Sequence, residues 1–206
     1  MKKGLFIALE GGEGTGKTTI SKAICEKLVE KGIDVIVTRE PGGIASAEAI
    51  RNTIMDFEVD PKTELLLYLS ARREHLVQKI KPVLERGGVV ISDRFYLSSL
   101  VYQGYARGLG METVRELNNF VCDIFPDVNI IIDVPAEIGV KRKFDMAELN
   151  RFDLEGADFH KKVEEGYKIL IDPINKEVTD NICVVDGTKS LEEVTDAVFK
   201  IVLENL

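Results

Sequence analysis

Short apolar runs alternate with longer segments of helical periodicity along the 206-residue chain. A continuous apolar run bounded by turn residues is typical of a strand that is buried on both faces. Five such runs cover residues 4–9, 34–38, 89–92, 128–132 and 181–185. Strands that alternate with helices predict an α/β fold with a five-stranded parallel sheet flanked by helices.

Between these runs, apolar residues recur every three or four positions, which is typical of helices packed on a sheet. Helices are predicted over residues 17–31, 45–56, 61–86, 98–106, 111–125, 136–144 and 159–178, with a last helix that includes residues 191–202, and a polar loop over 145–153. Core candidates include Leu65, Leu66, Leu69, Leu76, Ile80 and Leu84, and Leu191, Val194, Val198, Ile201 and Val202 on the last helix. Because we find no repeat and no linker, we expect one domain, residues 1–206.

The segment after the first predicted strand carries the most specific motif. It fits the pattern G-x-x-x-x-G-K-[ST] between a strand and a helix, the context in which this phosphate loop (P-loop) has meaning. Its residues are Gly11, Gly12, Glu13, Gly14, Thr15, Gly16, Lys17 and Thr18, followed by Thr19. The backbone N–H groups and the helix N-terminus attract phosphate, Lys17 can reach the transferring phosphates, and the Thr18 hydroxyl can hold Mg²⁺. The motif therefore predicts binding of a nucleoside triphosphate, against the alternative of a glycine-rich turn that binds nothing.

Composition narrows the class of protein. A net charge of −8 argues against a broad nucleic-acid footprint. No apolar run reaches the length of a membrane helix, so no membrane partner is expected. The three cysteines, Cys25, Cys122 and Cys183, lack metal-ligand spacing and predict buried free thiols in a cytoplasmic protein.

Charged residues follow the carboxyl ends of the predicted strands, the edge at which open parallel sheets bind ligands. Arg39-Glu40, Asp93-Arg94 and Asp133 lie there together with the P-loop. Two guanidinium groups beside a P-loop suit the phosphate of a second substrate, although each could equally form a surface ion pair. Asp93 could hold Mg²⁺ through water or orient the acceptor.

Further candidates surround this edge. Tyr68 and Arg72 share one helix face, where an acceptor base could stack, although Tyr68 alone could equally be a core residue. Ser98, Ser99, Tyr102 and Gln103 cluster on the helix after Arg94. The polar segment near Arg142, Lys143 and Arg151 is a candidate lid, about residues 142–153, against the alternative of a solvated surface loop.

These motifs together resemble those of the thymidylate kinase family of bacterial type. The resemblance rests on residues 10–19, Thr38-Arg39-Glu40-Pro41-Gly42-Gly43, residues 68–72, Asp93-Arg94 with Ser98-Ser99 and Tyr102-Gln103-Gly104, residues 150–153 and residues 186–188. It implies a P-loop nucleoside monophosphate kinase, usually a homodimer, that transfers the γ-phosphate of ATP to dTMP to give dTDP, with Mg²⁺.

The resemblance also implies roles for single residues. Arg39 and Arg94 match residues that hold the acceptor phosphate, and Glu13 lies beside the acceptor's sugar and phosphate. Tyr68 matches a ring that stacks on thymine, and Arg72, Ser99 and Gln103 match contacts near the base. Tyr102 matches a residue that crowds a ribose 2′-hydroxyl. Arg142 and Arg151 are the expected lid arginines, so the predicted catalytic set is Lys17, Glu13, Asp93, Arg94, Arg142 and Arg151.

Three positions depart from the family pattern. Ile44 replaces a threonine or serine, which removes a hydroxyl near the acceptor. Gly14 leaves the P-loop without an arginine, so the lid must supply the positive charge. Phe144 and Met146 lie where many relatives carry further basic residues, which predicts slower chemistry or a differently shaped lid.

Two alternatives stay open at this point. One is a kinase of the same fold for another acceptor, such as dUMP or a non-nucleotide. The other is a regulatory module that binds nucleotide with little transfer activity. For a guanine switch, Asn175-Lys176-Glu177-Val178 lacks the expected aspartate of the base-reading motif.

Overall fold

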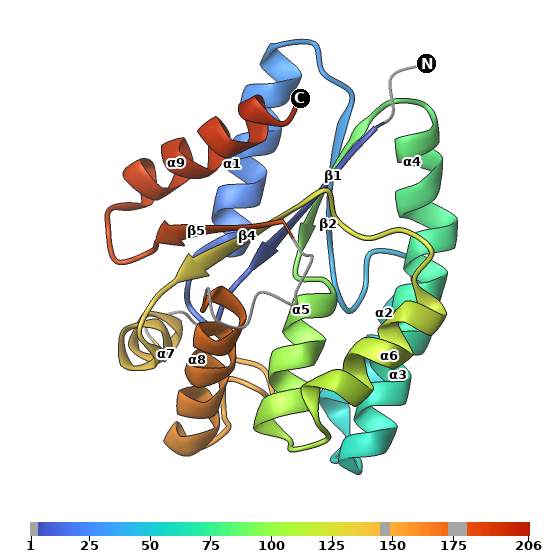
Figure 1. Ribbon diagram of the computed structural model, residues 1–206, viewed down its shortest axis with the longest axis vertical. Coiled ribbons are helices and arrows are strands. Elements are labelled where there is room, and N and C mark those ends of the chain that lie inside the picture. Colours follow the sequence, from blue (N-terminus) through green and yellow to red (C-terminus); the bar gives the residue numbers. More distant parts are fainter. Residues whose placement is uncertain (1–3, 145–148, 173–180) are drawn as a thin grey trace.

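The computed structural model describes residues 4–144, 149–172 and 181–206. Its centre is a five-stranded sheet in which every strand pair is parallel (Figure 1). The strands are β1 (Leu5–Glu10), β2 (Val35–Arg39), β3 (Val89–Asp93), β4 (Val128–Asp133) and β5 (Ile182–Asp186), in the order β2-β3-β1-β4-β5. The predicted α/β class and strand number are confirmed.

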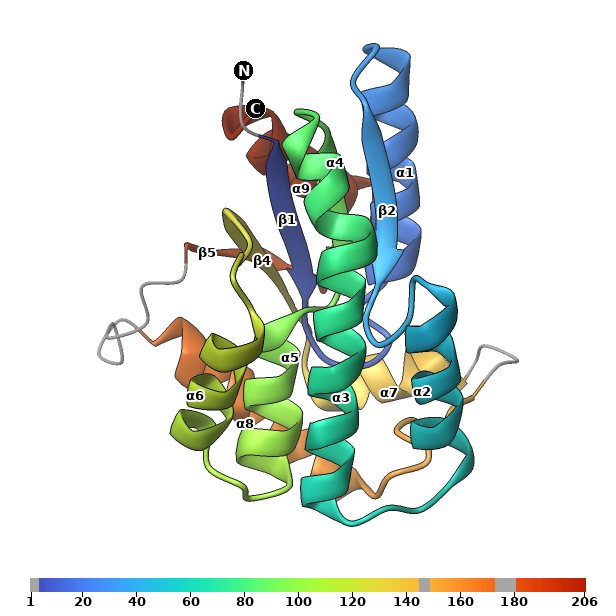
Figure 2. The ribbon, with the colours of Figure 1, turned by 90° about the vertical axis from the view of Figure 1, so that its right-hand side faces the viewer.

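Two helical layers cover the sheet because each face of each central strand is apolar. Leu5, Ile7 and Leu9 of β1 belong to a core shared with α1 (Lys17–Glu30) and α9 (Leu191–Glu204). Phe6 and Ala8 point the other way, into a second core built with the remaining large helices. Figures 1 and 2 show α1 and α9 on one side of the sheet and α3, α5, α6 and α8 on the other. This arrangement explains why the strands read as continuous apolar runs instead of alternating ones.

The second layer contains two π-helical segments. The long helix predicted over residues 61–86 is α3 (Pro61–His75), the π-helical η1 (Leu76–Ile80) and α4 (Lys81–Glu85) in direct succession. A second succession runs through α5 (Tyr96–Ser99) and the π-helical η2 (Leu100–Ala106). The other helices are α2 (Ala45–Asp56), α6 (Met111–Val121), α7 (Ala136–Phe144) and α8 (Ala157–Ile171).

Several predicted details differ from the structure. Helix α6 ends at Val121 instead of residue 125, and α8 is described from Ala157 to Ile171, while residues 173–178 of the predicted helix lie outside the described residues. Leu66 and Leu191 are exposed instead of packed in the core. Of the three free cysteines, Cys122 is buried and the other two are half-buried. The spacing of apolar residues places Leu66 and Leu191 on a helix face, but it does not indicate whether that face meets the core or solvent.

The order of the strands positions the site. From β1 the chain crosses to β2 and β3 on one side, and β4 and β5 lie on the other side. Ligands of open α/β sheets bind at such a switch point, outside the carboxyl ends of the strands. The P-loop leaves the sheet there, directly after β1.

Candidate active site

The P-loop closes tightly because its glycines adopt conformations that other residues avoid. Gly11, Gly14 and Gly16 have φ values of 138°, 65° and 85°. A Cβ atom on Gly14 would lie 1.9 Å from the carbonyl oxygen of Gly139 in α7. No side chain fits at position 14 against this helix, which gives a structural reason why an arginine is absent there.

Lys17 is buried and directed back along the loop. Its Nζ donates to Gly12 O at 2.7 Å, Thr15 Oγ1 at 2.9 Å and Gly11 O at 3.1 Å. Burial and the nearby Arg94 guanidinium lower the pKa of Lys17 to about 8, although Asp93 and Glu13 oppose the shift. The ammonium group is thus placed inside the loop that would surround a phosphate chain.

Thr18 and Asp93 bring two side-chain oxygen atoms together at the carboxyl ends of the strands. Thr18 Oγ1 donates to Asp93 Oδ2 at 2.5 Å, and Asp93 ends β3 next to β1. Within the described residues, no group of three or more His, Cys, Asp and Glu side chains could hold a metal ion. One hydroxyl and one carboxylate nevertheless fit Mg²⁺, which takes few protein ligands when phosphates and water supply the others.

Arg94, Glu13 and Tyr102 form a connected group beside the loop. Arg94 donates from NH1 to Gly11 O and from NH2 to Glu13 Oε1, both at 2.7 Å, and its guanidinium lies 4.9 Å from the centre of the Tyr102 ring. Tyr102 donates its hydroxyl to the same Glu13 oxygen at 2.9 Å. Burial alone would raise the pKa of Glu13, but Arg94 and Lys17 outweigh it and hold that pKa below its usual value. Glu13 is therefore an ionised carboxylate within the cleft.

The backbone at Arg94 is strained and held by named contacts. Its φ is 70°, in the left-handed region that residues with a Cβ avoid. Ser92 Oγ donates to Arg94 O at 2.7 Å, and the next amide, Phe95 N, donates to the buried Glu10 carboxylate at 2.9 Å. Burial raises the pKa of Glu10, whereas its hydrogen bond from Ser98 lowers it, and the net shift is upward. These bonds fix the direction in which Arg94 leaves β3.

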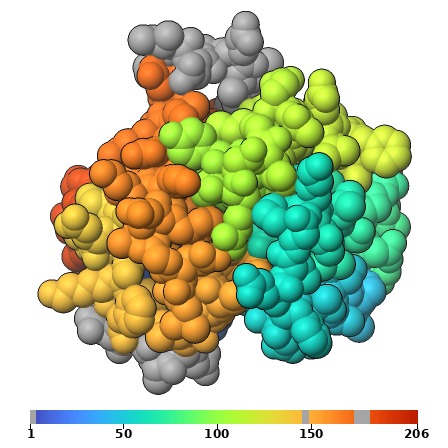
Figure 3. All heavy atoms as spheres, turned by 90° about the horizontal axis from the view of Figure 1, so that it is seen from below, coloured from blue at the N-terminus to red at the C-terminus, as the bar shows by residue number. Residues whose placement is uncertain are grey.

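One cleft brings together most of the residues predicted for the site. Its lining includes Glu13, Gly14, Thr15, Gly16, Lys17, Thr18, Thr19, Arg39, Tyr68, Arg72, Asp93, Arg94, Ser99, Tyr102 and Gln103. Gly11 and Gly12 line a second, smaller cavity between the loop, α7 and α8. In the space-filling view of Figure 3, the segment after residue 149 and α8 (orange) lie against green residues and against α3 (teal) on this side of the molecule.

The two predicted lid arginines do not line the cleft. Arg142 NH1 donates to Gly187 O at 2.9 Å, in the turn after β5. Arg151 pairs with Glu64, a buried carboxylate of α3 that also accepts from Gln103 Nε2 at 2.9 Å. Residues 145–148 of the predicted lid, with Met146, lie outside the described residues. Lys143, which follows Arg142 in the candidate lid, does line the cleft.

Several cleft residues escaped the sequence analysis. Arg51 of α2 and Phe152 line the cleft, and Phe152 meets Tyr68 and Tyr102 edge to face, with ring centres 6.4 and 6.0 Å apart. His75 and Asn118 are buried partners of the Arg72 region: His75 contacts Glu40, which pairs with Arg72, and Asn118 accepts directly from Arg72. No sequence pattern marks Asn118 as part of the site, because a single asparagine within a predicted helix belongs to no motif.

Comparison with known proteins gives a consistent answer. The family model described as thymidylate kinase matches residues 9–198. A thymidylate kinase of Shouchella clausii is 49% identical over 200 positions, covering 94% of this chain and 92% of the relative. One of Halalkalibacterium halodurans is 43% identical over 212 positions, covering 100% and 99%. A crystal structure of thymidylate kinase from Ehrlichia chaffeensis superposes with a TM-score of 0.76 at 33% identity, covering 97% of this chain and 99% of that one.

The P-loop between β1 and α1, the charged cleft and these matches over nearly the whole chain agree with one another. The chain belongs to the thymidylate kinase family.

Proposed function

We propose that this protein transfers the γ-phosphate of ATP to dTMP and releases dTDP and ADP. The observation that carries the proposal is one cleft in which a P-loop with a buried lysine and Glu13 faces Arg94 and Tyr68. A donor phosphate chain and a nucleoside monophosphate both have matching groups there. Formation of dTDP from ATP and dTMP by the purified protein, followed by chromatography, tests the proposal. ATP binding without dTDP would favour the regulatory alternative.

On the donor side, the loop residues 11–19 surround the phosphates of ATP. Their backbone N–H groups and Lys17 neutralise charge, and little covalent chemistry is required of the protein. Thr18 and Asp93 would hold Mg²⁺, directly or through water, and the ion when bound neutralises charge on the β- and γ-phosphate oxygens. Removal of divalent cations with EDTA should abolish transfer.

On the acceptor side, Arg39 and Arg94 hold the phosphate of dTMP. Arg39 pairs with Glu48 at 2.9 Å and is half-exposed, so it can reach the ligand, whereas Arg94 is already fixed next to Glu13. Glu13 then lies beside the sugar and phosphate, and Tyr102, which donates to Glu13, crowds the 2′ position. A hydroxyl at that position would compete with this contact, which favours a deoxyribose.

The base is held between Tyr68 and the Arg72 side of the cleft. Tyr68 offers the ring for stacking, and Phe152 supports it edge to face. Arg72, Ser99 and Gln103 lie at the inner end with buried polar atoms. These groups can hydrogen-bond to the edge of a pyrimidine while water is excluded.

The lid arginines act when the cleft closes over both substrates. Arg142 and Arg151 bind Gly187 and Glu64 in the structure, so both must exchange partners to reach a phosphate. Closure excludes water, which would otherwise accept the phosphoryl group. With a glycine at position 14, these arginines supply the positive charge that the P-loop lacks.

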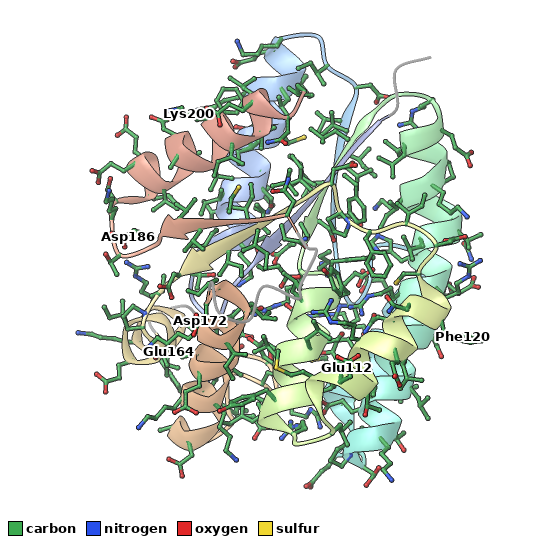
Figure 4. The ribbon with its side chains drawn as sticks, viewed as in Figure 1. Glu112, Phe120, Glu164, Asp172, Asp186 and Lys200 are labelled. Atoms are coloured by element: carbon green, nitrogen blue, oxygen red, sulfur yellow. The ribbon has the colours of Figure 1, made fainter. Side chains whose placement is uncertain are left out.

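We further propose that the protein is a homodimer. Large apolar side chains are exposed on α3, on η1, which continues it, and on α6, which packs against α3: Leu66 on α3 is 58% exposed, Val77 on η1 43% and Phe120 on α6 87%. Figure 4 shows Phe120 pointing away from the molecule. A monomer gains nothing from an apolar surface of this kind, whereas a second copy would bury it.

A further inference from the structure

The guanidinium group of Arg72 is enclosed by protein partners although it lines the cleft. The side chain is 2% exposed, and the guanidinium lies 4.9 Å from the centre of the Phe95 ring. Nε donates to Glu40 Oε2 at 2.6 Å. NH1 donates to Asn118 Oδ1 at 2.6 Å and to Ser99 Oγ at 3.0 Å. An arginine has five N–H donors, so these bonds use the Nε hydrogen and both hydrogens of NH1.

The third nitrogen remains for a ligand. Among the described residues, we find no hydrogen-bond partner for NH2 of Arg72. NH2 carries two donors and no acceptor. A ligand atom that meets it must therefore be an acceptor, such as the carbonyl oxygen of a pyrimidine, and an exocyclic amino group would be repelled.

Glu40 cannot turn away from Arg72 because its second oxygen is also bound. His75 Nδ1 lies 2.9 Å from Glu40 Oε1, and His75 Nε2 lies 2.7 Å from Thr38 Oγ1. Burial would raise the pKa of Glu40, but Arg72 and His75 outweigh it and lower that pKa, so the group is a carboxylate that only accepts. His75 Nδ1 is consequently the donor of this contact. One side of Arg72 is thus fixed to the end of β2.

Asn118 fixes the other side from a helix that does not line the cleft. It is fully buried in α6, where its Nδ2 donates to Val114 O at 2.8 Å. That bond determines which end of the amide faces Arg72, so Oδ1 must be the atom that accepts from NH1. Asparagine is a weak helix former, and a buried amide is costly unless both ends are paired. The presence of an asparagine at position 118 is therefore explained by its hydrogen bond with Arg72 and not by helix propensity.

We propose that Asn118 is a positioning residue of the acceptor site: it holds Arg72 so that NH2 alone faces the base, and it thereby sets the preference for a keto over an amino pyrimidine. The proposal rests on the proposed function, because it assigns the base to the cleft beside Arg72. Asn118 touches neither substrate. Its effect passes through the guanidinium, with Glu40 and His75 as the fixed side of the same clamp.

The test compares Asn118→Leu with the wild-type protein. Leucine has a similar size and no acceptor, so Arg72 loses one charge-assisted bond and can rotate. We expect the Kd for dTMP, measured by calorimetry without ATP, to rise about tenfold. KM for dTMP should rise with it, whereas kcat and KM for ATP change less than about threefold. The ratio of kcat/KM for dTMP to that for dCMP should fall about tenfold.

Two further variants separate positioning from a loss of stability. Asn118→Asp keeps an oxygen for Arg72 and should restore most of the dTMP affinity. Val114→Ala, a buried truncation on the same helix, should lower Tm but leave the Kd for dTMP and the dTMP to dCMP ratio unchanged. Should Asn118→Leu fail to fold, Asn118→Ala is judged by the same measurements. The proposal is overturned if the dTMP affinity and the ratio survive the loss of the amide, or if Val114→Ala reduces them equally. A wild-type protein that binds dTMP but forms no dTDP would instead contradict the proposed function. The comparison of dTMP affinities between the variants would remain valid in that case, because it does not depend on catalysis.

Discussion

At the residue scale, the site depends on charged groups that are removed from water. Lys17 and Arg72 are buried, the side chains of Arg94 and Glu13 are largely buried, and each charge has an opposite charge or carbonyl oxygens beside it. Such pre-positioned charges interact more strongly with a ligand than exposed ones, because little solvent must be displaced. The same burial shifts their pKa values, which makes the arrangement measurable.

The pKa of Lys17 predicts an alkaline limb in the pH profile. With a pKa of about 8, Lys17 is charged below pH 8 and loses its proton as the pH rises through that value. Since kcat/KM reports on the free enzyme, kcat/KM for ATP should fall above about pH 8. In Lys17→Arg the residual activity should lack this limb, because a guanidinium does not deprotonate in this range. An unchanged kcat/KM for wild type up to about pH 9.5 would show that the lysine keeps its ordinary pKa.

The sequence predicted which residues line the cleft better than it predicted their contacts with one another. The P-loop is predictable because its residues are consecutive in the sequence. Tyr68 and Arg72 are predictable because a spacing of four residues places both on one helix face. The contact between Asn118 and Arg72 joins residues 46 positions apart, and the Glu40 contact spans 32. No local pattern encodes such pairs, so the sequence places Glu40 at the edge of the sheet, but its contacts with Arg72 and His75, and the role of Asn118, are seen only in the fold.

At the scale of elements, the turn after β2 shows how one substitution changes a helix start. Ile44 is the N-cap of α2, with φ −142° and ψ 160°, the extended conformation in which a serine or threonine would cap the helix. Its side chain makes no capping hydrogen bond. The hydroxyl that the family pattern has at this position, and that this chain lacks, would therefore cap α2.

Ile44→Thr should therefore stabilise the protein. A side-chain cap contributes about 1 kcal/mol, which corresponds to a rise in Tm of about 2–4 °C for a protein of this size. Ile44→Val is the matched control, since valine has the shape of threonine without the hydroxyl. The test is the Tm of the wild type, Ile44→Thr and Ile44→Val in thermal unfolding. A Thr variant no more stable than the Val variant would mean that the free N–H groups at the start of α2 are hydrogen-bonded in another way.

The lid arginines provide a second prediction at this scale. Arg142→Ala and Arg151→Ala should each reduce kcat about a hundredfold or more, because they supply transition-state charge that Gly14 leaves out. Lys141→Ala, on the same helix but exposed, is the control and should retain full turnover. Steady-state kinetics with saturating ATP and dTMP measure the effect. Intact turnover in both arginine variants would refute the lid assignment.

At the scale of the whole molecule, the fold was the most predictable part. Five buried strands separated by helices leave few arrangements once connections are short and crossovers right-handed. The spacing of apolar residues does not distinguish a core-facing position from an exposed one. Leu66 is an example, since it lies on α3 as predicted but is exposed. A pattern with 3.6 residues per turn also cannot predict the π-helical conformation of η2.

The exposed apolar surface of α3, η1 and α6 predicts self-association. Light scattering with size-exclusion chromatography should give twice the chain mass for the wild-type protein. Phe120→Glu should shift the protein toward the monomer, because it places a charge at the most exposed large apolar side chain of this surface. Leu203→Glu on α9, where the leucine is 42% exposed, should leave the dimer unchanged. A wild-type monomer would rule out this role for the surface.

The central claim is that the cleft phosphorylates dTMP in preference to other monophosphates. Its most direct test is the initial rate of ATP turnover with Mg²⁺ and dTMP, dUMP, dCMP, dGMP or AMP offered in parallel. We expect the highest kcat/KM for dTMP, with dTDP as product and little transfer to the other four. A higher kcat/KM for any of the other four acceptors would contradict the claim and would show that the assignments of Tyr68, Arg72 and Tyr102 are wrong.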